Sequence, residues 1–523
     1  MEISSSFPAI AYDEGQKYTI VPAKYIARSS VSGNCDKILF IRREVKDLFQ
    51  MLKDEVMEES CVRHILGPPG VGKSLATFAF ACTLLDPFHV VTWIFLTQQM
   101  EPSFVRFIDG KKRSGHVESV EWLKRFLIDP ECEDKIHLVV LDGYTDDDPS
   151  HRCYPPACNA WVLQDMKHRR HVSVYSMSSS KKLHPCSIEQ LKLSQYLIGS
   201  WTKDQYREAL QSSAFLNQVK DKLDAHVTVS GGIIDHEQLM ESKFFFSGGS
   251  CRYMFDYSTQ AVIEDIDYNL ERCGDLFPYL SGTIGACSNG AVDHLLCSSS
   301  REKSNFIPVS EYAATAIAKK LGPNLISNLR TILKSAMNPS MDGHLFEMWF
   351  FAKLEHGKLE FKSKWAEHKQ WWTLNRWSHC VWDQSTVVPF DPEGNLPPIC
   401  TFTNTWLKPL KWNQGGYDAV FLQPNIKSVT FVQLTRSDTH SFKPKYFKAL
   451  LENMKKNWRL DFQFLDICFA VPSFCAHGFS VQRPSDPNEV GLFEQYFVHS
   501  DRQRKWNRHQ ELTCTRICSI VEH

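Results

Sequence analysis

The sequence predicts an α/β protein in which a parallel sheet covered by helices is followed by a helical region and a second α/β domain. Three observations predict this. A glycine-rich loop lies between an apolar run and a helix-compatible stretch, within residues 64–81. Apolar runs then alternate with helical ones up to about residue 176, which is typical of strands buried on both faces. After about residue 341 tryptophans cluster, and strand-like pairs replace helices.

The loop fits the pattern G-x-x-x-x-G-K-[ST], the phosphate-binding loop of P-loop nucleoside triphosphatases. Its residues are Gly67, Pro68, Pro69, Gly70, Val71, Gly72, Lys73 and Ser74. Glycines let backbone N–H groups turn inward to phosphate oxygens, and the following helix presents its positive end to the same anion. Lys73 is expected to reach the β- and γ-phosphates, and Ser74 to ligate Mg²⁺. The predicted cofactors are therefore ATP or GTP together with Mg²⁺.

A second part of the nucleotide site is predicted where a later strand ends. The apolar run Ile136–Leu141 is closed by Asp142, about 70 residues after the loop. An acid in this place completes the magnesium shell in P-loop proteins, so Asp142 is expected to bind Mg²⁺ and to take part in catalysis. Many ATPases place a glutamate next in the chain to polarise water, but Gly143 follows here. The sequence thus predicts nucleotide binding and leaves turnover open.

Arg252 is a further candidate for nucleotide binding. It follows a stretch rich in glycine and serine, where the start of a helix can direct a guanidinium toward phosphates. An ordinary surface arginine is the alternative. The strand that ends at Ser176 is a candidate carrier of a polar sensor for the γ-phosphate.

Composition limits the possible classes of protein. A chain of 523 residues is expected to form two or three domains. The net charge of -1 argues against a uniformly basic nucleic-acid coat protein, although a local basic patch remains compatible. The 17 cysteines are scattered without repeated metal-binding spacing, which favours reduced thiols over zinc. Neither a membrane-spanning stretch nor a recognisable secretory signal is found, so a soluble, intracellular type of chain is expected.

The pattern divides the chain into an N-terminal lead-in, a nucleoside triphosphatase domain, a helical linker region and a C-terminal domain. Their predicted bounds are 1–57, 58–255, 256–340 and 341–523. The lead-in is expected to end in an amphipathic helix from about residue 42 to 56. Further helices are expected at 203–219, 259–273, 310–320 and 323–336, with a long loop rich in glycine, serine and cysteine at 281–300.

Three polar residues of the C-terminal domain are predicted to form a catalytic site. Asp418 and Gln433 lie on two strand-like runs joined by a turn at 423–425, so both are expected near one end of a hairpin. Glu347 lies on an apolar helix, where a carboxylate is costly without a partner. Such oxygen ligands bind Mg²⁺, which activates water for phosphodiester hydrolysis. Glu347, Asp418 and Gln433 are the candidate catalytic residues, with Asp418 and Gln433 as metal ligands.

This pattern resembles the restriction-endonuclease-like, PD-(D/E)xK, fold, whose third motif is E-x-K. The corresponding residues here are Gln433-Leu434-Thr435, and a threonine cannot replace the positive charge of the lysine. Lys443, Lys445 or Lys448 on the following helix are candidates to approach instead.

Charge in the same region favours a polyanionic partner. Ten basic residues and three acidic ones lie between residues 408 and 460, with Tyr446, Phe447 and Trp458 among them. This combination suits phosphate contact and base stacking, so DNA is the expected partner. A solvated helix face is the alternative.

Three signatures together suggest a family: the loop at 67–74, the pair of strings at 200–202 and 243–252, and the strings at 431–435 and 439–442. Over residues 58–500 the chain resembles the Crinkler effectors of oomycetes and chytrid fungi and the related retrotransposon hot spot proteins of trypanosomes. In those families an AAA/STAND-like P-loop NTPase is coupled through a helical region to a restriction-endonuclease-like domain. The chain departs from the pattern at Thr435 and in having no LFLAK string near its N-terminus.

The resemblance implies a DNA-directed virulence effector, secreted into a host cell and accumulating in its nucleus. In this hypothesis nucleotide binding regulates a C-terminal Mg²⁺-dependent nuclease. One alternative is an ATPase whose C-terminal domain only binds nucleic acid. Another is a STAND-like switch whose C-terminal domain binds protein. Oligomerisation is left open.

Overall fold

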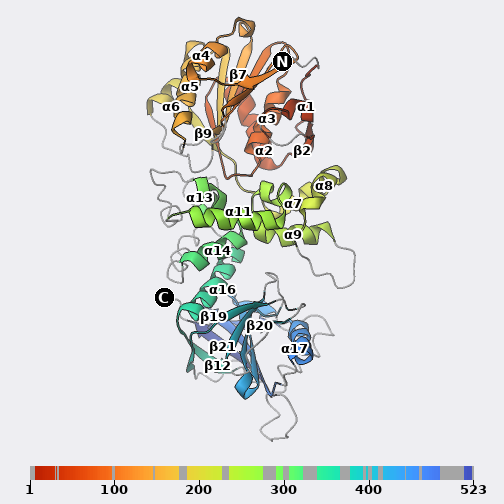
Figure 1. Cartoon of the computed structure of the whole chain (residues 1–523), viewed down its shortest axis with the longest axis vertical. Coiled ribbons are helices and arrows are strands. Elements are labelled where there is room, and N and C mark those ends of the chain that lie inside the picture. Colours follow the sequence, from red (N-terminus) through yellow and green to blue (C-terminus); the bar gives the residue numbers. More distant parts are fainter. Residues whose placement is uncertain are drawn as a thin grey trace. The chain divides into compact units, whose positions relative to one another are not determined.

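The chain folds into two compact units, residues 1–313 and residues 314–523, both drawn in Figure 1. No helix among the described residues is long and apolar enough to cross a membrane. The computed structural model describes residues 6–29, 31, 35–96, 101–144, 148–175, 185–225, 235–274, 290–298, 306–321, 339–365, 377–390, 392, 396–397, 403–409, 416–441, 443–458, 462–482 and 512–520.

A seven-stranded sheet forms the centre of the first unit, in the order β6-β5-β4-β7-β8-β3-β9. From β4 to β9 all neighbours are parallel, which confirms the predicted parallel sheet. Strands β5 and β6 extend it as an antiparallel hairpin that the sequence did not reveal. The strands are β3 (Arg63–Leu66), β4 (His89–Phe95), β5 (Ser103–Ile108), β6 (Lys111–His116), β7 (Ile136–Tyr144), β8 (Arg169–Tyr175) and β9 (Ser194–Leu197).

Helices cover both faces of this sheet. Figure 1 shows α2 and α3 on one side of it and α4, α5 and α6 on the other. Successive residues of β7 enter different cores: Val140 joins the core of α3, whereas Val139 joins that of α4 and α5. The helices are α2 (Arg43–Met51), α3 (Lys73–Thr83), α4 (Val120–Leu127), α5 (Tyr154–Gln164) and α6 (Pro185–Leu191), and a π-helix over Leu52–Glu58 continues α2.

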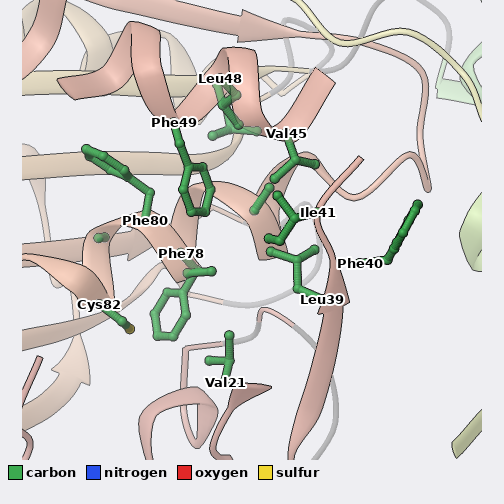
Figure 2. Close-up of a cluster of buried hydrophobic side chains, with 14 of the residues drawn as sticks. Val21, Leu39, Phe40, Ile41, Val45, Leu48, Phe49, Phe78, Phe80 and Cys82 are labelled. Atoms are coloured by element: carbon green, nitrogen blue, oxygen red, sulfur yellow. The ribbon is translucent and has the colours of Figure 1, made fainter. Parts of the chain in front are cut away.

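The N-terminal segment is part of the same core. It forms a two-stranded antiparallel sheet of β1 (Tyr18–Val21) and β2 (Lys37–Phe40), with α1 (Ala23–Ile26) between the strands. Figure 2 shows Val21 and Leu39 beside Phe78 of α3, and all three belong to one buried cluster. The predicted bound at residue 57 stays a prediction, but residues on both sides of it share this core.

The rest of the first unit is largely helical. The predicted helices at 259–273 and 310–320 are confirmed within one residue, whereas the one at 203–219 is two helices, because Ser212 caps the second. The predicted loop at 281–300 is wrong for residues 290–298, which form a helix and a strand, and the helix at 323–336 lies outside the described residues. The elements are α7 (Lys203–Leu210), α8 (Ser213–Val219), α9 (His236–Ser247), α10 (Cys251–Phe255), α11 (Thr259–Arg272), α13 (Gly290–Leu295), α14 (Glu311–Leu321, which extends into the second unit), β10 (Leu296–Ser298) and β11 (Phe306–Pro308).

An eight-stranded mixed sheet forms the second unit, in the order β13-β12-β21-β19-β17-β16-β15-β14. The predicted hairpin is confirmed, because β16 and β17 pair antiparallel. The elements are α16 (Pro339–His356), β12 (Leu359–Trp365), β13 (Ser378–Trp382), β14 (Val387–Phe390), β15 (Thr405–Pro409), β16 (Ala419–Gln423), β17 (Ser428–Leu434), β18 (Thr439–Ser441), α17 (Pro444–Trp458), β19 (Phe464–Pro472), β20 (Ser480–Gln482) and β21 (Leu512–Ile520).

Helices α16 and α17 pack on opposite faces of this sheet. On β15 the ring of Trp406 contacts Phe350 of α16, with ring centroids 5.5 Å apart. The next residue, Leu407, belongs to the core that contains Phe447 of α17. Because neighbouring residues of a strand point to opposite faces, one helix covers each face.

Candidate functional site

The candidate phosphate loop and the candidate magnesium ligand lie at one edge of the first sheet. The loop follows the carboxyl end of β3, and Asp142 lies near the carboxyl end of β7. Strand β8 separates β3 from β7, and all three are parallel. Carboxyl ends of parallel strands share an edge, so the two parts of the site meet there across one strand.

Two glycines give the loop its shape. Gly70 has φ 71°, and a Cβ there would lie 2.3 Å from the Ser250 hydroxyl oxygen. A Cβ on Gly67, where φ is 155°, would lie 2.5 Å from the carbonyl oxygen of Ile198. Side chains are therefore excluded at both positions, and the backbone can curl with its N–H groups inward.

Lys73 is buried at the start of α3, with 9% of its surface exposed. Its ammonium donates to the carbonyl oxygens of Gly67 and Pro68, both at 2.7 Å. Burial lowers the pKa of Lys73 to about 8, with the charge of Arg252 adding to the shift and those of Asp293 and Asp142 opposing it. The lysine is thus held inside the loop by weak, exchangeable acceptors.

The structure brings Ser74 and Asp142, the two candidate magnesium ligands, together. The Ser74 hydroxyl donates to a carboxylate oxygen of Asp142 at 2.8 Å. Asp142 is only 2% exposed, and burial raises the pKa of its carboxyl to about 6, against the hydrogen bond from Ser74 and the charge of Lys73. An oxygen pair of this kind fits a hard cation bound with a triphosphate.

The position after Asp142 cannot hold a side chain. Gly143 has φ 80°, and a Cβ there would lie 2.3 Å from the carbonyl oxygen of Leu96. The pairing of β7 with β8 is also irregular between Asp142 and Tyr144. The glutamate that many ATPases use here is therefore excluded by geometry as well as by sequence. Of the nearby acids, Asp146 and Asp147 lie outside the described residues, and Asp148 caps a short helix through Ser150.

Distant side chains hold the outer carbonyl groups of the loop. Arg42, from the N-terminal segment, donates to the carbonyl oxygens of Val71 at 3.3 Å and Gly199 at 2.8 Å. The indole of Trp201 donates to the same Val71 oxygen at 3.1 Å. Arg42 is 2% exposed and its guanidinium lies 5.2 Å from the ring centroid of Trp201. Together they hold the Val71 carbonyl group of the loop in place.

Helix α10 holds the other half of the loop. The Arg252 amide donates to the carbonyl oxygen of Gly70 at 3.0 Å, and the Ser250 hydroxyl donates to that of Pro69 at 3.4 Å. The exposed Arg252 guanidinium lies close enough to lower the pKa of both Lys73 and Asp142. Asp293 of α13, which the sequence analysis missed, raises the pKa of Lys73 by its charge. Nothing in the sequence near the loop predicts that Asp293 acts on Lys73.

An apolar cavity of about 120 Å³ lies beside the loop. Its walls come from the N-terminal segment, from the loop and α3, and from the helical region. The polar groups at its rim are already paired: Lys37 with Asp256 at 3.7 Å, and the Gln218 carbonyl oxygen with the Ile38 amide at 3.2 Å. The lining residues are Lys37, Ile38, Leu39, Phe40, Val45, Val71, Gly72, Leu75, Trp201, Phe215, Gln218, Val219, Cys251, Phe255 and Asp256.

In the second unit two of the predicted catalytic residues come together. Glu347 of α16 approaches Asp418, which immediately precedes β16, and burial together with the charge of Glu347 raises the pKa of Asp418 above its ordinary value. One Asp418 oxygen accepts the Leu434 amide at 2.7 Å. The Lys408 ammonium of β15 lies 3.2 Å from a Glu347 oxygen. We call Glu347, Lys408 and Asp418 the acidic cluster.

Gln433 lies on the neighbouring strand. It is 6% exposed, and its carbonyl oxygen has no hydrogen-bond partner. By strand alternation its side chain points to the same face as Phe431, which packs on α17. Asp418 precedes Ala419, the pairing partner of Val432, so Asp418 and Gln433 lie next to each other across the hairpin, and the charge of Glu347 acts on Asp418 from α16. Among the described residues no three His, Cys, Asp or Glu side chains form a metal-binding group.

Comparisons with known proteins add little. No protein-family model matches the chain, and no curated protein matches it. Among solved structures 31 chains match. One of them is the S. cerevisiae Hsp104-ADP complex, at 10% sequence identity and a TM-score of 0.30, with 65% of this chain and 45% of that chain covered. This chain thus spans less than half the length of that chain, and we draw no functional conclusion from a likeness this weak.

Proposed function

We propose that the first unit binds a nucleoside triphosphate with Mg²⁺ at the loop Gly67–Ser74. The observation that carries this proposal is the hydrogen bond between Ser74 and Asp142, which joins the loop to the end of β7 with Lys73 beside it. When bound, Mg²⁺ neutralises charge on the phosphates and orients the reacting oxygens. Ser74 and Asp142 are the residues that would hold it.

The chain's own groups account for phosphate binding. The inward N–H groups of the loop and the N-terminus of α3 attract the anion. Lys73 exchanges the carbonyl oxygens of Gly67 and Pro68 for phosphate oxygens, which are stronger acceptors because they are charged. Arg252 adds a second positive charge from α10.

The nucleobase is proposed to occupy the apolar cavity next to Val71 and Gly72. The rings of Phe40 and Trp201 in its walls offer flat apolar surfaces for a base. Because the rim groups are already paired, the cavity offers no side chain dedicated to one base edge. ATP and GTP therefore both remain candidates.

Hydrolysis is proposed to be slow without help from outside this site. The place beside Asp142 holds Gly143, where a Cβ would clash with Leu96. A nucleotide-dependent change in α10, whose Ser250 and Arg252 contact the loop, is then the main output, and it would control the second unit.

Thermal unfolding with added nucleotide tests nucleotide binding. A ligand that binds only the folded state at 100 times its dissociation constant stabilises by about 2.7 kcal/mol. ATP or GTP with Mg²⁺ is expected to raise the melting temperature of the wild type and of Lys53→Ala, which removes an exposed lysine of the π-helix. Lys73→Ala is expected to lose the rise. An equal rise in Lys73→Ala, or none in the wild type, would contradict the proposal.

For the second unit we propose a DNA-directed function of the restriction-endonuclease-like kind. Its support is the succession of α16, the antiparallel β15-β16-β17, α17 and then β19 parallel to β17, with the acidic cluster where α16 meets this sheet. Exposed lysines on and next to α17 supply charge for a polyanion: Lys443, Lys445, Lys448, Lys455 and Lys456. Crinkler membership, secretion and the host nucleus stay proposals that rest on the sequence resemblance.

Binding of duplex DNA at several salt concentrations tests this function. Affinity is expected to fall steeply with salt, and to fall further in the double variant Lys445→Ala/Lys448→Ala. A matched double variant at exposed lysines of the first unit, Lys53→Ala/Lys124→Ala, should bind as the wild type does. Absence of salt-dependent binding would leave the alternative, a nucleotide-controlled switch whose second unit binds protein.

A further inference from the structure

Lys408 holds an unusual position in the second unit. It lies on β15 on the same face as Trp406, the face that α16 covers. Its ammonium lies 3.2 Å from a Glu347 oxygen and 4.6 Å from the ring centroid of Phe351, also on α16. The Lys408 and Glu347 side chains are only 25% and 21% exposed. A lysine is thus fixed next to the carboxylates by two contacts.

A positive charge next to Glu347 and Asp418 reduces the repulsion between these two carboxylates. Glu347 lies within electrostatic range of Asp418, and two like charges near each other in a partly buried place repel. The ammonium of Lys408 pairs directly with Glu347 and so offsets this repulsion.

Thr435 occupies the position that holds the lysine in the nuclease pattern. Thr435 is 7% exposed, and its hydroxyl accepts the Ser437 amide at 3.2 Å, so it forms a local turn. Lys443, Lys445 and Lys448 lie on or just before α17, which packs on the opposite face from Glu347 through Phe447. Lys408, on the face covered by α16, is the lysine that pairs with Glu347.

We propose that Lys408 supplies the positive charge that the nuclease pattern takes from a lysine at position 435. This inference rests on the proposed DNA-directed function of the second unit. In phosphodiester hydrolysis a water oxygen forms a bond to phosphorus and the water releases a proton, while the bond from phosphorus to the sugar oxygen breaks and the sugar oxygen takes up a proton. Lys408 stabilises the negative charge on the non-bridging oxygens during this step. Water is the only co-reactant.

Cleavage of plasmid DNA by the full chain with Mg²⁺ tests the role. Asp418→Asn is expected to abolish cleavage. Lys408→Met is expected to lower the single-turnover rate constant about 10²- to 10³-fold with DNA affinity retained, as for loss of one transition-state donor. Lys408→Arg should recover part of the rate, because it keeps the charge. Lys358→Met, at an exposed lysine of the same unit, should cleave as the wild type does.

The outcomes separate the two proposals. Cleavage lost in Asp418→Asn but unchanged in Lys408→Met overturns the role of Lys408 and leaves the nuclease function standing. No cleavage by the wild type, or full cleavage by Asp418→Asn, overturns the nuclease function and the role of Lys408 with it. Loss of both rate and folding in Lys408→Met, seen by thermal unfolding, moves the decision to Lys408→Arg: a folded arginine variant without partial activity overturns the role.

Discussion

The phosphate loop of the first unit and the acidic cluster of the second are built in different ways. The loop is one run of eight residues whose inner face is backbone, and its outer carbonyl groups are held by Arg42, Trp201 and Ser250. The acidic cluster takes one side chain from α16, one from β15 and one from the start of β16. The first site is carried by local chain geometry, and the second by the packing of separate elements.

This difference determines which substitutions each site tolerates. Backbone groups cannot be removed by substitution, so the loop is sensitive mainly at its glycines, Lys73, Ser74 and the side chains that brace it. A cluster of side chains fails with any one member, but a member can also be supplied by another element of the fold. In our proposal Lys408 of β15 takes the place of a lysine at position 435 in this way.

The largest loss of stability is expected for substitution of Gly143, where the fold leaves no room for a side chain. Gly143→Glu is expected to cost about 2 to 5 kcal/mol of unfolding free energy, because it adds backbone strain to a clash with the Leu96 carbonyl. Urea unfolding measures it. Gly274→Glu is the control, since a Cβ there meets nothing within 4 Å. A stable Gly143→Glu with faster ATP hydrolysis would show that the position is open to a catalytic base.

The braces of the loop are the next test. Arg42→Met is expected to cost about 2 to 4 kcal/mol and to weaken nucleotide binding, because four carbonyl or amide oxygens lose a charged donor. Its neighbour Arg43 is exposed, so Arg43→Met should change little. Chemical unfolding and nucleotide titration of both variants measure the two effects. Unchanged nucleotide affinity in a destabilised Arg42→Met would mean that the loop keeps its shape unaided.

Acid is expected to weaken the sheet that carries the loop. His171 of β8 is fully buried between Asn159 and Ser173, and burial lowers its pKa to about 3, with the charge of His64 adding to the shift. Between pH 6.5 and about 3 the unfolded histidine binds a proton that the folded one does not. Stability should therefore fall by up to about 1.4 kcal/mol per pH unit as pH falls through this range.

The measurement is the unfolding free energy at pH 7 and pH 5 for the wild type and for His171→Gln. As pH falls, the variant should lose stability less steeply than the wild type. The difference corresponds to the one proton that His171 binds in the unfolded state but not in the folded state. The exposed His116→Gln is the control and should keep the slope of the wild type. An identical slope in His171→Gln would show that this histidine is not held neutral.

The smallest expected effect distinguishes the role of Ser250 as a helix cap from its contact with the loop. Ser250 caps α10 and also donates to the Pro69 carbonyl of the loop, whereas Ser258 caps the next helix, α11. Ser250→Ala and Ser258→Ala should each cost about 1 kcal/mol, as for loss of an N-cap. Thermal unfolding should show similar losses, and nucleotide titration should show weaker binding in Ser250→Ala alone. Equal nucleotide affinities of the two variants would show that the contact of Ser250 with the loop does not support nucleotide binding.

Much of the first site could be predicted because its signal is local. Strand, loop and helix follow one another within residues 63–83, and Asp142 ends an apolar run. The braces could not be predicted, because Arg42 and Ser250 meet the loop only after the whole unit has folded. Lys112 shows the same limit: it lies on a polar strand, yet it is 2% exposed and donates to three carbonyl groups of the N-terminal segment.

The second unit was less predictable for the same reason. The hairpin of β16 and β17 follows from its apolar runs and the turn between them. The pairing of Glu347 with Lys408 depends on how α16 lies on β15, which no spacing in the sequence encodes.

Equilibrium binding of labelled ATP and GTP to the full chain, with and without Mg²⁺, tests the central claim most directly. The wild type and Asp418→Asn should bind at least one of the two nucleotides equally well, because Asp418 belongs to the other unit. Lys73→Ala should bind at least about a hundredfold more weakly, since it loses a charge-assisted contact to the phosphates. Binding by Lys73→Ala at wild-type strength, or no Mg²⁺-dependent binding by the wild type, would contradict the account.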